Sequence, residues 1–179
     1  MRWGLIFGHE SVLNDFSKLT GSDKTLIGAA YLYKQKRLIQ RFDYLYPENL
    51  VNVFEQGIIE CIKGRGEVDA ARFKLERMIP DTEAFPEPEG AYAQHLMIAL
   101  IYLLGFSKSG KPDVFEDAIA MALENIELIS YEADEGYRYD SMLKKERLAA
   151  TLMIGRLGEE NRHPSDLASL SHICAGFSI

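Results

Sequence analysis

Apolar residues recur at three- to four-residue steps along most of the chain, the period of an α-helix with one buried face. The first such stretch covers residues 23–45 and follows Ser22, which can cap a helix. Tyr46-Pro47 then interrupts the pattern. Pro47 suits the first position of a second helix, which Gly64 ends. The pattern thus predicts two helices in the first third of the chain.

The same periodicity predicts four further helices and a short last one. Residues 91–105 are apolar on nearly every side, as in a helix surrounded by neighbours. Asp113 and Glu116 have the spacing of a capping box, and Asp140 can cap the helix that follows. The expected helices span about 67–79, 91–105, 113–132 and 140–157, with a short one around Leu167 and Leu170.

Signals for β-strands are almost absent. Residues 3–7 could form a short strand, and the choice between strand and helix stays open for the first ten residues. No internal repeat or second domain is found in the 179 residues. We therefore expect an all-α fold: a single-domain bundle (1–179) of about six to eight helices around a central apolar helix at about 91–105.

The expected location is the cytoplasm. The longest uninterrupted apolar stretch, 96–104, has half the length of a membrane-spanning helix, and the first residues lack the apolar segment of a signal peptide. Cys61 and Cys174 are too few for a disulfide framework and have no Cys-x-x-Cys spacing. We expect reduced thiols and no membrane association.

The charge is unevenly distributed. The chain carries a net charge of −7, and residues 113–140 contain nine acidic side chains and one basic one, Arg138. Such a face disfavours nucleic acid and favours a basic protein partner, although a merely solvated helix face has the same composition. The predicted partner-binding residues are Glu124, Glu127, Glu132, Asp134, Glu135 and Asp140.

A basic run at 34–37, next to Tyr31 and Tyr33, has the composition of an RNA-binding surface. The run lies on one side of a predicted helix whose other positions suit ordinary packing. We therefore expect nucleic acid not to be a partner.

Motifs for catalysis and metal binding are incomplete. Residues 105–112 match the Gly-x-x-x-x-Gly-Lys spacing of a phosphate-binding loop, but Pro112 stands where a hydroxyl would bind magnesium, so a turn between helices is expected. Glu160 and His163 form a single Glu-x-x-His, whereas helical di-metal sites need two. Cys61 falls on a buried helix face, where a thiolate is disfavoured. We predict no catalytic residue, no metal and no cofactor.

A possible ligand site is predicted on the central helix, at Gln94, His95 and Tyr102. The alternative interpretation of His95 is a core histidine held by hydrogen bonds.

Three segments, 41–47 (Arg-Phe-Asp-Tyr-Leu-Tyr-Pro), 75–85 and 90–92, resemble the YjaG-like family of uncharacterised bacterial proteins, also called domain of unknown function 416. The resemblance extends over roughly 26–132. It implies an all-helical fold and a bacterial cytosolic protein. It implies no activity and no site residues.

The expected function is a non-catalytic protein-binding module, most concretely an acidic immunity protein or inhibitor that neutralises a basic toxin or nuclease. One alternative is a small-ligand-binding or enzymatic helical bundle with its polar site near His95. Another is a homodimeric scaffold joined through exposed apolar helix faces.

Overall fold

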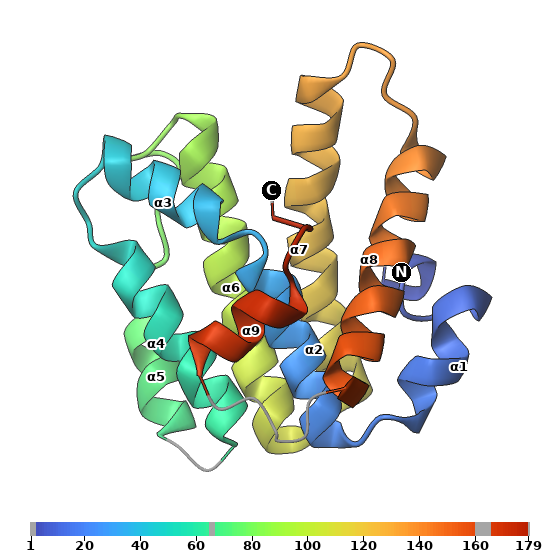
Figure 1. Cartoon of the computed structure of the whole chain (residues 1–179). Coiled ribbons are helices and arrows are strands. Elements are labelled where there is room, and N and C mark those ends of the chain that lie inside the picture. Colours follow the sequence, from blue (N-terminus) through green and yellow to red (C-terminus); the bar gives the residue numbers. More distant parts are fainter. Residues whose placement is uncertain (1–2, 65–66, 160–165, 179) are drawn as a thin grey trace.

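The computed structural model describes residues 3–64, 67–159 and 166–178, and within these ranges the chain is all-helical, without strands. The predicted all-α bundle around a central apolar helix is confirmed (Figure 1). The described helices are α1 (Glu10–Lys18), α2 (Gly21–Tyr33), α3 (Lys36–Leu45), α4 (Leu50–Lys63), α5 (Val68–Glu76), α6 (Pro88–Ser109), α7 (Pro112–Ala133), α8 (Tyr139–Glu159) and α9 (Leu167–Ile173).

Helix α6 is the centre of the bundle and contacts α2, α3, α4, α5 and α7. Leu96, Leu100 and Leu103 along it are fully buried. Length and composition alone would let α6 cross a membrane, but 56% of its most apolar window is buried inside the protein. Core helices of bundles have the same property, so α6 by itself does not indicate a membrane segment.

Two glycines allow α6 to approach its neighbours closely. A Cβ atom at Gly28 of α2 would lie 2.6 Å from Leu103 Cδ1, and one at Gly57 of α4 would lie 2.8 Å from Leu100 Cδ2. Glycine has a low helix propensity, so the presence of Gly57 inside α4 is explained by this close packing.

The single helix predicted over 23–45 is wrong, because α2 and α3 are separated at Lys34 and Gln35. Both side chains are buried, and the backbone leaves the helical conformation at Gln35, with φ −97° and ψ 8°. The predicted cap is also wrong. Thr20 caps α2 in a reciprocal capping box with Asp23, in place of Ser22.

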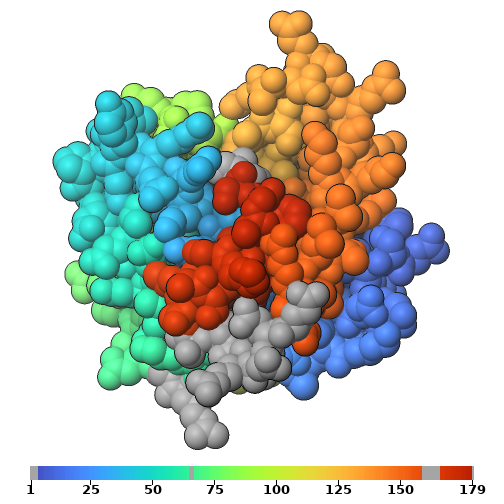
Figure 2. Space-filling view, viewed as in Figure 1, coloured from blue at the N-terminus to red at the C-terminus, as the bar shows by residue number. Residues whose placement is uncertain are grey.

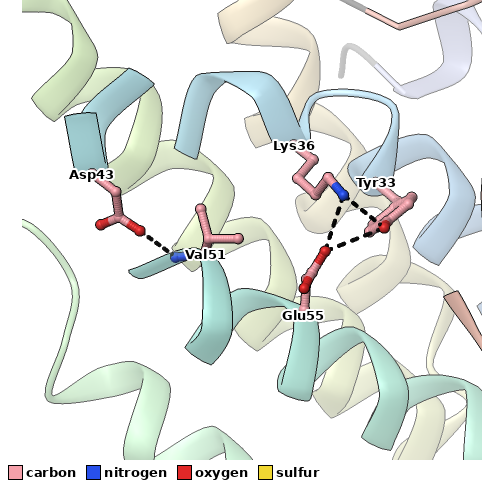
Figure 3. Close-up of polar contacts among 5 residues, drawn as sticks. All are labelled: Tyr33, Lys36, Asp43, Val51 and Glu55. Carbon is pink, nitrogen blue, oxygen red and sulfur yellow. Dashed lines mark hydrogen bonds and ion pairs between the residues drawn. The ribbon is translucent and has the colours of Figure 1, made fainter. Parts of the chain in front are cut away.

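Helix α4 begins at Leu50, so the predicted start at Pro47 is wrong. Asp43, from α3, accepts hydrogen bonds from the backbone N–H groups of Leu50 (2.7 Å) and Val51 (2.8 Å) and so caps α4 across the loop. Figure 3 shows the bond to Val51. Gly64 ends α4 in a left-handed conformation, as predicted.

Helices α7 and α8 begin within one residue of their predicted starts, but their predicted caps are wrong. Lys111 precedes α7 and makes no side-chain cap, so Asp113 and Glu116 do not form a capping box. Asp140 lies in the first turn of α8, which begins at Tyr139, and does not cap it.

Both ends of the described chain are helical. A 3-10 turn at Trp3–Leu5 stands where the sequence left strand and helix open, and α1, which the sequence did not predict, packs against α8. Arg147 of α8 donates to the carbonyl oxygen of Leu5 at 2.7 Å. The predicted last helix is present as α9, which lies across α2 at the centre of the face in Figure 2.

Candidate functional site

The predicted partner-binding residues lie in the second half of α7, in the connection 134–138 and in the first turn of α8. This end projects beyond the neighbouring helices at the top of the view (Figures 1 and 2). Asp134 is held in a turn by accepting the N–H of Gly136 at 2.8 Å. Glu135 and Asp140 are exposed. We call this part of the molecule, residues 124–140, the acidic end.

A hollow of about 300 Å³ opens on the acidic end. The predicted residues Glu124 and Glu127 line this hollow and are half-buried. Its other lining residues are Leu128, Tyr131 and Tyr137. Tyr131 is 68% exposed, and its ring meets that of Tyr137 edge-on with centroids 5.8 Å apart. The hollow thus combines two carboxylates with two aromatic rings.

Sequence reasoning missed Leu128, Tyr131 and Tyr137 as site residues. A signal for the first two was present, because Glu124, Leu128 and Tyr131 are separated by four and three residues and so share one face of α7. Large apolar side chains on an exposed acidic face are unexpected for a face that serves solvation alone.

Glu132 differs from the other predicted carboxylates, because it accepts a hydrogen bond from the Tyr92 hydroxyl of α6 at 2.6 Å. Burial, followed by the hydrogen bond and charge of Glu132 and the charge of Glu89, raises the pKa of Tyr92 despite the opposing Arg41. Glu132 therefore ties α7 to α6.

The three residues of the predicted ligand site have separate roles. Gln94 donates to the carbonyl oxygen of Pro80 at 2.9 Å and holds the connection before α6. Tyr102 lies two turns further along α6 and is 38% exposed. The structure therefore does not bring Gln94, His95 and Tyr102 together into one polar cluster.

His95 is hydrogen-bonded to the fully buried Asn125 of α7, with 2.9 Å between Nδ1 and Oδ1. Asn125 Nδ2 donates to the carbonyl oxygen of Tyr92, which leaves Oδ1 to accept the proton on His95 Nδ1. The Nε2 atom then faces Glu124, whose Oε2 is 3.9 Å away. This geometry is that of a hydrogen-bonded core histidine whose outer nitrogen adjoins the acidic hollow through Glu124.

A buried polar cluster of Tyr31, Lys34 and Glu146 joins α2 to α8. The Tyr31 hydroxyl donates to Glu146 Oε2 at 2.6 Å, and the Lys34 ammonium donates to the same oxygen. Burial lowers the pKa of Lys34 despite the opposing charge and hydrogen bond of Glu146 and the nearby Cys174. Tyr31 is fully buried, and burial raises its pKa, assisted by Glu146. The cluster is a structural link between two helices, because all three groups are enclosed.

The basic run at 34–37 does not form a continuous exposed surface. Lys34 and Gln35 are buried, and Gln35 donates to the carbonyl oxygen of Ala122 at 3.1 Å. Lys36 binds the Tyr33 hydroxyl (2.9 Å) and Glu55 Oε1 (3.0 Å), as Figure 3 shows. Although burial would lower it, these partners raise the pKa of Lys36. The side chains of the run are thus largely used in joining helices.

Metal and thiol chemistry have little support in the part of the chain that is described. No three or more His, Cys, Asp and Glu side chains there are grouped to hold a metal ion. Cys61 and Cys174 are buried free thiols, and burial raises the pKa of each. Glu160 and His163, the candidate Glu-x-x-His pair, lie outside the described residues.

Comparisons with known proteins give no match to a family model, a curated protein or a solved structure. The resemblance to the YjaG-like family therefore stays a prediction.

Proposed function

We propose that this protein is a non-catalytic binding protein that captures a basic protein through its acidic end. The most concrete form of the proposal is an inhibitor that neutralises a basic toxin or nuclease. The observation that carries it is the hollow that Glu124 and Glu127 line together with the paired rings of Tyr131 and Tyr137.

The composition of this hollow suits a protein interface. Tyrosine is enriched among the residues that dominate binding energy, because a rigid ring buries much area at little entropic cost. Lysine or arginine side chains of a partner would meet carboxylates and aromatic faces in the same hollow, which permits both ion pairs and cation–π contacts. The surrounding carboxylates would speed encounter by electrostatic steering.

The test compares captured proteins from a lysate of the source cells for three forms of the protein. The first form is wild type, and the second carries Glu124→Gln and Glu127→Gln. The matched control carries Glu116→Gln and Asp117→Asn, which remove the same charge from the other end of α7. Glu132 is left unchanged because it holds Tyr92.

We expect wild type and the control to capture one basic protein in stoichiometric amount, and the hollow variant to lose it. Tyr131→Ala should weaken binding of the purified partner by about 2 kcal/mol, roughly 30-fold in Kd, as for an interface hot spot. Equal capture by all three forms would contradict the proposal. Recovery of the protein with only copies of itself would favour the homodimeric alternative.

A further inference from the structure

A second hollow, of about 360 Å³, lies at the other end of α7. It is formed where α1 leads into α2 and where α6 turns into α7, at the lower end of the molecule in Figure 1. This place is remote from the acidic end, so the two hollows are independent features.

The walls of this second hollow are mainly apolar. Phe16 and Phe106 each pack against Phe115, with ring centroids 5.4 Å and 5.1 Å apart, and Leu13 adds an apolar side chain that is 43% exposed. The volume is at the small end of the range of small-molecule sites, which are typically apolar with a few polar groups.

The charged side chain that lines this hollow is a cation, Lys24. Lys24 is half-buried, lines the hollow, and has its ammonium nitrogen 5.3 Å from the centroid of the Phe16 ring. Among the side chains described in residues 4–64, 67–158 and 166–178, no carboxylate lies within ion-pair distance of Lys24. A partly desolvated ammonium beside apolar walls gains from an anion more than a fully hydrated one would.

The start of α2 adds positive potential at the same place. Gly21, the first residue of α2, lines the hollow, and the N-terminal end of a helix favours negative charge. The nearby Asp23 carboxylate is committed to the cap, where it accepts from the N–H and the hydroxyl of Thr20 at 2.9 Å and 2.6 Å.

We propose that this hollow binds a small amphipathic carboxylate, an aliphatic or aromatic acid. The apolar part of the acid lies against Phe106 and Phe115, and its carboxylate pairs with Lys24. The inference does not depend on the capture of a basic protein at the acidic end.

Isothermal titration calorimetry with octanoate, octan-1-ol and octylamine tests this proposal on the full chain, because the three probes share a chain and differ in charge. Octanoate should bind about tenfold more tightly than the other two. Lys24→Gln should reduce the affinity for octanoate to that for octan-1-ol and leave octan-1-ol unchanged. Lys18→Gln is the matched control, since Lys18 is exposed and pairs with Asp15 at 3.0 Å.

A second variant locates the binding. Ser17 is exposed on the wall of the hollow, so Ser17→Phe should fill the space and abolish binding of octanoate while circular dichroism shows an intact helical fold. Absence of saturable octanoate binding, equal affinity for the three probes, or an octanoate affinity that Lys24→Gln or Ser17→Phe leaves unchanged would overturn the proposal.

Discussion

Lys34 and Lys36 are two residues apart and have different environments. The Lys34 side chain is 1% exposed and pairs with Glu146, whereas Lys36 is 27% exposed and pairs with Glu55. A buried ammonium that loses its counter-charge cannot recover hydration, whereas a partly exposed one can. The two ion pairs should therefore contribute unequally to stability.

Glu146→Gln should lower the free energy of unfolding by about 3–5 kcal/mol, because it leaves a buried charge without compensation. Glu55→Gln, the matched control, should cost less than about 1 kcal/mol. Chemical denaturation at neutral pH measures both. Equal losses would show that burial of Lys34 is not what distinguishes the pairs.

The loss in Glu146→Gln should depend on pH. Burial lowers the pKa of Lys34 in the folded protein, so between that value and the ordinary lysine pKa of about 10.4 the unfolded chain binds more protons than the folded one. Stability attributable to Lys34 therefore rises with pH in this window. The deficit of the variant should shrink from pH 7 toward pH 10, since the lysine can then be buried neutral. A deficit that grows over that range would contradict this.

At the residue scale, the sequence showed that acidic residues cluster in one stretch, but it did not show which contacts each carboxylate makes. Glu127 lines the hollow at the acidic end, whereas Glu132 accepts a hydrogen bond from Tyr92, although both belong to one acidic run. The partner of Glu132 lies 40 residues away in the chain, so only tertiary packing reveals it.

At the element scale, two helical glycines should respond in opposite ways to alanine. A Cβ at Gly57 would meet Leu100 at 2.8 Å and Leu75 at 3.0 Å, whereas a Cβ at Gly155 of α8 meets nothing within 4 Å. Gly155→Ala should stabilise the protein by about 1 kcal/mol through helix propensity alone.

Gly57→Ala should lose about 1–3 kcal/mol despite the same gain in propensity, because overpacking displaces α4 from α6. Thermal unfolding of the two single variants measures both effects. A stabilising Gly57→Ala would show that Leu75 and Leu100 move aside without cost.

Helix α6, which is apolar on nearly every side, and helix α7, which has a clear apolar period, were predicted well because their local pattern and their packing agree. The break between α2 and α3 was not predicted, because no glycine or proline marks it in the sequence. The two residues at the break bind distant partners, Lys34 to Glu146 and Gln35 to Ala122, which lie 112 and 87 residues away. The start of α4 escaped prediction for a related reason: Asp43, which caps it, belongs to the preceding helix.

For the whole molecule, the structure separates two surfaces that the sequence did not distinguish. The acidic stretch 113–140 covers both ends of α7, but the carboxylate-and-tyrosine hollow lies at one end and the apolar hollow with Lys24 at the other. The acidic end was predictable from composition. Its aromatic residues required the helix register, and the second hollow required the meeting of four helices.

Association kinetics with the captured basic protein test the central claim most directly. The rate constant for association should fall at least about tenfold from low to physiological ionic strength, because steering by exposed carboxylates is screened. The Glu124→Gln, Glu127→Gln variant should associate more slowly and with a weaker salt dependence, while the Glu116→Gln, Asp117→Asn control stays close to wild type. An association rate that is independent of salt and the same in all three forms would contradict a binding function for the acidic end.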